Sequence, residues 1–159
     1  MISSEHINVL RQIKTQLANT DIDWVVTGSL ALALQGVPVE VRDIDIHTDE
    51  QGAYGIESLF SDYVQDRVAP SYTQDVRSYH GKLVIDGIEV EIIGDIQKRC
   101  EDGTWEDLAA IEHHKRVVAV VGMAIPVFSL EYEYQAYLRL GREKRAQVIK
   151  EWMTREQKQ

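Results

Sequence analysis

Three carboxylates at two places in the sequence could together bind a divalent cation. Asp43 and Asp45 are two residues apart in a segment that alternates polar and apolar residues, and Glu91 lies in a later segment of the same kind. Residues two apart on a strand point to the same side of a sheet, so the two aspartates should project side by side. Carboxylates crowded on one face repel one another unless a cation neutralises them. Such a cluster would suit Mg²⁺ and the in-line displacement of phosphoryl groups.

A glycine and a serine follow an apolar segment and precede a helix-forming one. The apolar segment 22–27 ends at Gly28, and Ser29 comes before the helix formers of 30–35. Backbone N–H groups at a helix N-terminus attract phosphate, and glycine lets an anion approach without a Cβ in the way. Alone, such a pair is more often a helix cap, and a lone Asp-x-Asp is more often a solvated strand face. Their combination with a third acid is what indicates a nucleotide site.

These motifs occur in a fixed order along the chain. They are Gly28-Ser29, thirteen intervening residues, Asp43-Ile44-Asp45-Ile46, and later Val90-Glu91-Ile92-Ile93-Gly94. The pattern resembles that of the DNA polymerase β-type nucleotidyltransferase superfamily, in particular its small bacterial members, which include the antibiotic nucleotidyltransferases. The resemblance covers residues 24–94. It implies that Gly28 and Ser29 hold a nucleoside triphosphate. It also implies that Asp43 and Asp45 bind Mg²⁺, and that Glu91 binds metal or acts as a base.

The sequence departs from this family pattern in two ways. The third acid is glutamate where aspartate is more usual, and Glu89 lies on the same strand face as Glu91. Glu91 is preferred because it directly precedes an apolar pair, as the family's third acid commonly does. No lysine or arginine motif marks a triphosphate clamp. The candidates for that role are Arg42, Arg77, Lys82 and Lys98.

The resemblance implies a Mg²⁺-dependent transfer of a nucleoside monophosphate from an NTP, with ATP the expected donor. The acceptor would be a hydroxyl of a small molecule or a protein, and Glu91 or Asp45 would help to deprotonate it. The alternative is a catalytically inactive domain that binds a nucleotide or a partner protein. With 17 basic and 26 acidic residues the formal charge is −9. This charge argues against a nucleic-acid partner and so disfavours an enzyme that modifies RNA.

Composition is typical of a globular protein of the cytoplasm. The only cysteine is Cys100, which excludes an internal disulfide, and the N-terminal residues lack the features of a signal peptide. The longest apolar run, 117–128, is interrupted by Gly122 and Pro126 and is too short to cross a membrane. At 159 residues we expect one domain, with a core over about 1–128 and a helical tail over about 129–159. The oligomeric state is not predicted.

Hydrophobic spacing predicts an α+β fold, in which helices pack on a mixed sheet. With the resemblance, this becomes a nucleotidyltransferase-like core followed by C-terminal helices that help to form the acceptor site. Ser3 or Ser4 is expected to cap the first helix, and Ser29 the second. The expected elements are a helix through 7–17, a strand at 22–27, a helix at 30–35, a strand at 43–47, a helix at 50–60, at most one strand in 63–80, a hairpin over 82–93 turning at Asp86-Gly87, strands at 116–121 and 124–128, and helices at 129–140 and around 146–153.

Other residues that could do chemistry are assigned structural roles. His47 is expected to be an exposed strand histidine, and His113 and His114 cannot both face one ligand on a helix or strand. Zinc is improbable without cysteine ligands. Tyrosines at helical spacing in the tail are expected to pack as core more than to line an acceptor pocket. They are Tyr132, Tyr134 and Tyr137.

Overall fold

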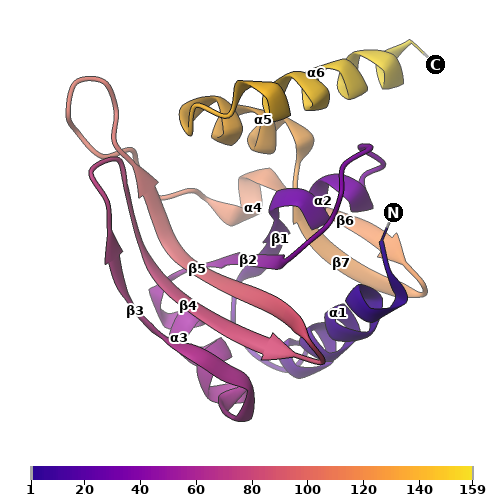
Figure 1. The fold of residues 1–159 in the computed structure, drawn as a ribbon, viewed down its shortest axis with the longest axis vertical. Coiled ribbons are helices and arrows are strands. Elements are labelled where there is room, and N and C mark those ends of the chain that lie inside the picture. Colours follow the sequence, from indigo (N-terminus) through magenta and orange to yellow (C-terminus); the bar gives the residue numbers. More distant parts are fainter. Residues whose placement is uncertain (1, 159) are drawn as a thin grey trace.

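The computed structural model describes residues 2–158, which form a seven-stranded mixed sheet with helices packed against it (Figure 1). The α+β fold expected from the sequence is confirmed. The elements in chain order are α1 Ser4–Leu17, β1 Trp24–Thr27, α2 Gly28–Leu34, β2 Ile44–Thr48, α3 Glu50–Leu59, the 3₁₀ turn η1 Ser61–Tyr63, β3 Val64–Tyr72, β4 Val76–Ile85, β5 Ile88–Lys98, α4 Ile111–His114, β6 Lys115–Val120, β7 Met123–Phe128, α5 Leu130–Arg139 and α6 Glu143–Gln157. No helix among the described residues is long and apolar enough to cross a membrane.

The sheet order is β3-β4-β5-β2-β1-β7-β6. Strand β2 runs parallel to β5 and antiparallel to β1, and β1 runs parallel to β7. The remaining neighbours are antiparallel hairpins. The two strands that carry the predicted acids, β2 and β5, are therefore adjacent in the sheet although they lie more than forty residues apart in sequence.

One face of the sheet is buried against α1 and α3, and this burial fixes the direction of the acids. The main core joins apolar residues of both helices to Ile44 and Ile46 on β2 and to Val90 and Ile92 on β5. Because side chains alternate along a strand, the residues between these apolar positions must point to the other face. Asp45 and Glu91 therefore both project from the side opposite α1 and α3.

The C-terminal helices α5 and α6 pack on each other and on α2 and the loop after it (Figure 1). Their shared cluster includes Leu32, Tyr137 and Ile149. Gly36 is part of this contact, because a Cβ built there would lie 2.8 Å from the Trp152 ring. The tail is thereby held close to the turn between β1 and α2 that carries the predicted phosphate-binding residues.

Most predicted elements are confirmed, and two expectations are wrong. Residues 63–80 contain the whole of β3 and the first half of β4, not at most one strand. Strand β3 is an edge strand in which only Val68 is buried, so it lacks the alternating burial that identifies a strand. Ser29 does not cap α2, because the helix already begins at Gly28 and its N-cap is Thr27. Ser3 does cap α1, through a bond from the His6 backbone.

Two hairpin turns place both of their central residues in the left-handed backbone region. Asp86 and Gly87 have φ of 50° and 81°, and Val121 and Gly122 have φ of 46° and 77°. Two-residue hairpin loops favour this geometry because it matches the strand twist. Aspartate and glycine tolerate positive φ, whereas a β-branched residue such as Val121 is strained there.

Replacing Val121 by asparagine should therefore stabilise the protein. We expect Val121→Asn to raise the free energy of unfolding by about 1 kcal/mol, since asparagine adopts positive φ at lower cost than valine. Urea denaturation would measure this change. The control is Val117→Asn, at an exposed strand position where asparagine should give no gain. Equal stability of Val121→Asn and the wild type would contradict the strain argument.

Candidate functional site

Asp45 and Glu91 lie side by side on neighbouring strands. They are direct partners in the parallel pairing of β2 with β5, and Thr27 is the partner of Asp45 on β1. Burial raises the pKa of the Asp45 carboxyl, and the charge of the adjacent Glu91 carboxyl is the next cause. Asp43 and Glu133 add smaller repulsions. The site is thus a crowded negative cluster in which Asp45 resists ionisation.

Asp43 reaches this cluster from just outside the strand. It lies in the bend immediately before β2, is half-buried, and is close enough for its charge to raise the pKa of Asp45. Within residues 2–158, no three His, Cys, Asp or Glu side chains converge tightly enough to form a complete metal-binding group. This arrangement is compatible with Mg²⁺, because Mg²⁺ usually takes only one or two carboxylates and completes its shell with water and substrate phosphates.

An unsatisfied oxygen of Asp45 supports a cation at this place. Asp45 Oδ1 is buried and makes no hydrogen bond within the described chain. A buried polar atom without a partner is costly, and a carboxylate oxygen is a preferred ligand of hard cations. The residues present therefore fit a divalent cation bound to Asp45, with Glu91 and Asp43 as the neighbouring acids.

The geometry favours Glu91 over Glu89 as the third acid. Glu89 is displaced from Asp45 along β5 and forms an ion pair with Lys82 at 3.8 Å. Glu91 is paired with Asp45 across the strands, and its Oε1 lies 3.8 Å from His80 Nε2. Only Glu91 can therefore share a ligand with Asp45 without first breaking an ion pair to Lys82.

Position 28 requires glycine because a side chain there would strike Asp45. The φ of Gly28 is +71°, and a Cβ built on it would overlap Asp45 Oδ2. The sequence predicted that this glycine lets a phosphate approach the backbone. In the structure, the Asp45 carboxylate occupies the space beside the Gly28 Cα, the Gly28 backbone N–H is bonded to Glu133, and Ser29 follows in the first turn of α2. The predicted phosphate and metal residues are thus brought together at one corner of the sheet.

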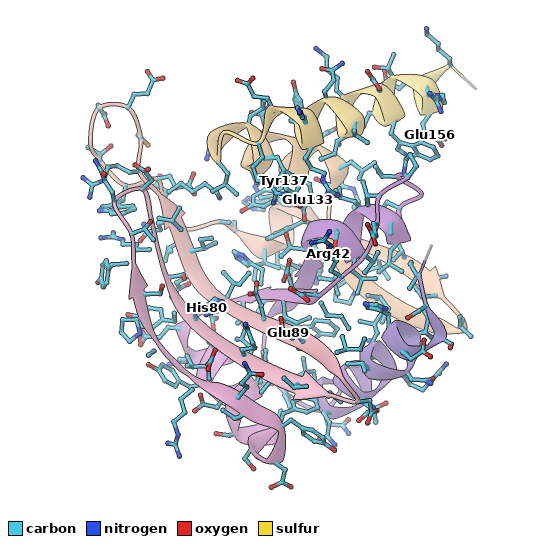
Figure 2. All side chains as sticks on the ribbon, viewed as in Figure 1. Arg42, His80, Glu89, Glu133, Tyr137 and Glu156 are labelled. Atoms are coloured by element: carbon cyan, nitrogen blue, oxygen red, sulfur yellow. The ribbon has the colours of Figure 1, made fainter. Side chains whose placement is uncertain are left out.

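Sequence reasoning missed Glu133, an acid that enters the site from α5. Its side chain is 2% exposed, and its Oε1 accepts hydrogen bonds from Thr27 Oγ1 at 2.5 Å and from the Gly28 backbone N–H at 3.1 Å. Burial raises the pKa of Glu133 to about 7, against the opposing effects of these two bonds and of Lys98. In Figure 2, Glu133 and Tyr137 lie where α5 faces α2. Nothing in the local sequence distinguishes Glu133 from its exposed neighbour Glu131.

The four candidate cations for a triphosphate are placed differently. Lys82 is the cross-strand partner of Glu91 and forms an ion pair with Glu89. Lys98 is buried and bonded to Glu106, and Arg77 stacks on the Trp105 ring at 4.5 Å. Arg42 is exposed next to Asp43 (Figure 2). Lys82 and Arg42 are thus the two candidates beside acids of the site, and Lys82 would have to release Glu89 to bind phosphate.

Two adjoining cavities lie between the sheet and the C-terminal helices. The smaller, about 150 Å³, is lined by site residues that include Gly28, Asp45 and Glu133. The larger, about 500 Å³, lies between the loop 106–110, α4 and the outer side of α5. The lining residues common to both are Lys98, Tyr132 and Ala136. The two cavities thus share one wall, and only the smaller one is lined by Asp45 and Glu133.

The histidines and tyrosines differ in part from expectation. His47 is not exposed: it is 5% exposed and packs edge-on against Phe128 at 4.8 Å, and burial followed by the charge of Lys98 lowers its pKa to about 4. The Phe128 ring covers His47, and this contact cannot be predicted from the sequence of β2 alone. Tyr137 is buried as expected, while Tyr132 both packs on Phe128 and lines the two cavities. Tyr134 packs against the cluster of the C-terminal helices.

Comparisons with protein families and with solved structures both identify nucleotidyltransferases as similar to this chain. The sequence profile of the aminoglycoside-2''-adenylyltransferase family matches residues 9–153. The crystal structure of TM1012, a candidate nucleotidyltransferase from Thermotoga maritima, is 57% identical with a TM-score of 0.87, covering 98% of this chain and 96% of that one. No curated protein sequence matched the chain.

Two antibiotic-modifying enzymes share the fold at low sequence identity. ANT(2'')-Ia, solved with adenylyl-2''-tobramycin, is 14% identical with a TM-score of 0.62, over 88% of this chain and 78% of that one. The lincosamide antibiotic adenylyltransferase LnuA, solved with lincomycin, is 12% identical with a TM-score of 0.60, over 94% of this chain and 97% of that one. At such identities the likeness concerns the fold alone.

Gly28→Ala should disturb the site more than its backbone strain alone would. We expect a loss of about 1–2 kcal/mol from the left-handed backbone, together with displacement of Asp45 by the added methyl group and a weaker affinity for Mg²⁺. Urea denaturation and calorimetric Mg²⁺ titration would measure the two effects. Gly87→Ala is the matched control, because Gly87 has φ of +81° but open space around it. Mg²⁺ affinities that are the same in both variants would contradict the contact argument.

The pKa of Glu133 makes stability depend on pH in a defined direction. The pKa of Glu133 is about 7 in the folded protein, whereas the ordinary pKa of a glutamate, 4.5, applies when the chain is unfolded. Its contribution to stability is thus fully present below pH 4.5 and is lost as pH rises through 7. As the pH is raised from 4.5 to 7, the free energy of unfolding of the wild type should therefore decrease relative to that of Glu133→Gln.

Urea denaturation of both proteins at several pH values would measure that difference. His47 also titrates, but it is present in both proteins, so its effect cancels; because Glu133 influences the pKa of Asp45, the comparison is made in an Asp45→Asn background. A difference that stays constant from pH 4.5 to pH 8 would show that Glu133 does not hold a proton in the folded state.

Proposed function

The chain belongs to the aminoglycoside-2''-adenylyltransferase family, and from that premise we propose that it is a Mg²⁺-dependent enzyme that transfers AMP from ATP to a hydroxyl group of a small molecule. The observation that carries the proposal is the pairing of Asp45 with Glu91 across two strands, with the unsatisfied Asp45 Oδ1 next to Gly28. An acid pair of this kind is destabilising in the free protein, which favours a role for it in binding a cation.

In the proposed reaction the acceptor oxygen attacks the α-phosphorus of ATP in line with the leaving pyrophosphate. A new P–O bond forms to the acceptor, and the P–O bond to pyrophosphate breaks. Mg²⁺ bound to Asp45 would supply positive charge against the phosphate oxygens. Glu91, whose side chain is 31% exposed, would receive the acceptor's proton, since Asp45 Oδ1 is fully buried. The protein mainly positions the two substrates and balances charge.

The larger cavity favours a small, polar acceptor. Its volume of about 500 Å³ is within the range of small-molecule sites, and its lining is rich in charged and polar groups such as Glu106, Glu131 and Arg139. Tyr132 adds an aromatic surface between this cavity and the acids. The two solved enzymes of the same fold are described with antibiotics bound, which agrees with an acceptor of this class. We therefore place the acceptor in this cavity.

The nucleotide part of the proposal is tested by calorimetry. The wild type should bind ATP only in the presence of Mg²⁺, and Asp45→Asn should lower that affinity on the order of 100-fold, because it removes the charge of a buried ligand. Asp62→Asn is the control, since Asp62 is an exposed acid remote from the acids of the site. Equal binding by Asp45→Asn and the wild type would reject the assigned site.

The transfer itself is tested with ATP labelled at the α-phosphate. We expect the label to enter a hydroxylated small molecule and pyrophosphate to be released in equal amount, and Glu91→Gln to abolish both. A panel of polyhydroxylated compounds, followed by a protein extract, would serve as acceptors. Nucleotide binding without transfer to any acceptor would instead identify a catalytically inactive binding domain, and label in a protein alone would reject the small-molecule acceptor.

A further inference from the structure

Glu133 connects the C-terminal helices to the turn that carries Gly28. It lies on α5, more than a hundred residues after the turn, and its Oε1 accepts hydrogen bonds from both the Thr27 hydroxyl and the Gly28 backbone N–H. Both donors belong to the junction between β1 and α2. A single carboxylate oxygen therefore fixes the position of this junction relative to α5.

This acid is buried at a cost that packing alone does not explain. Glu133 is 2% exposed, and no lysine or arginine forms a salt bridge with it within residues 2–158. A buried carboxyl group without a cationic partner destabilises a fold unless its hydrogen bonds compensate. An apolar residue would be expected at this place if filling space were its only role.

The junction held by Glu133 touches the acids directly. Thr27 is the cross-strand partner of Asp45, and Gly28 lies against Asp45 Oδ2. A shift of Gly28 would therefore change the space available to the Asp45 carboxylate, and it would move Ser29, the next residue of α2. Glu133 does not need to touch a nucleotide to influence the site, because its effect can pass through Gly28.

We propose that Glu133 is a positioning residue of the nucleotide site, which holds the Thr27-Gly28 junction against Asp45 and so fixes the first turn of α2 where the phosphates bind. This inference rests on the proposed nucleotide site. It makes the C-terminal helices part of that site through one side chain rather than only a wall of the acceptor cavity. The hydrogen bonds carry the effect, so an acceptor oxygen at this position matters more than its charge.

The main alternative is that Glu133 opposes the binding of nucleotide. A carboxylate bonded to the Gly28 N–H occupies an anion-binding position at the start of α2 and would repel a triphosphate. In that case the removal of Glu133 would tighten the binding of nucleotide. The two roles therefore predict changes of opposite sign, and a binding measurement separates them.

The experiment is a calorimetric titration of the full-length protein with Mg²⁺ and α,β-methylene-ATP, which cannot be turned over at the α-phosphate. We expect Glu133→Ala to weaken binding about tenfold and Thr27→Val, which removes one donor with little change of shape, to weaken it about threefold. Glu133→Gln keeps an acceptor oxygen and should bind within about threefold of the wild type. Glu151→Ala, at an exposed position on α6, should have no effect.

The order of nucleotide affinities among the variants distinguishes a positioning role from a simple loss of structure. Thermal unfolding would confirm that each variant is folded, and if Glu133→Ala does not fold, a loss of affinity in folded Thr27→Val still supports the proposal. Unchanged or tighter binding by Glu133→Ala, or by Thr27→Val, overturns it. A loss in Glu133→Gln as large as in Glu133→Ala also overturns it. If the wild type does not bind the nucleotide, the proposed function itself fails, and this inference fails with it.

Discussion

The repulsion between carboxylates on one face of the sheet is the constraint on which the other features of the site depend. Asp45 and Glu91 are forced together by the parallel pairing of β2 with β5. The apolar residues on either side of them, such as Ile46 and Ile92, are buried against α1 and α3, so a slip of one residue in either strand would exchange core and site. The same burial that stabilises the fold therefore maintains an arrangement of charge that is unfavourable in the absence of a cation.

The sequence was sufficient to predict those parts of the fold that have local signals. The alternation of polar and apolar residues predicted a strand that contains Asp45. The Asp86-Gly87 turn predicted the hairpin whose second strand carries Glu91. Edge strand β3 was missed because both of its faces are largely exposed and its residues show no period of two. Local patterns detect burial, and they fail where an element has little of it.

The parts of the site that could not be predicted come from contacts between distant segments. Glu133 looks like any acid in the first turn of a helix, and only the packing of α5 beside α2 makes it a partner of Gly28. His47 lies on the same strand face as Asp45 and so was expected to be exposed, but Phe128 from β7 covers it. Gly28 was predicted to let a phosphate approach the backbone, and the contact of this position with Asp45, which a side chain there would strike, is visible only in the structure.

The two cavities share one wall but are otherwise bounded by different parts of the fold. The small cavity is built from strand ends and α5, whereas the large one is bounded mainly by an exposed loop and outward-facing side chains. Exchanges on that outer boundary, for example at Asp107 or Gln135, leave the strand register and the acid pair untouched. Under the proposed function, single replacements on that boundary would change the surroundings of the acceptor without changing the acid pair, whereas replacements of Lys98, Tyr132 or Ala136 would alter both cavities.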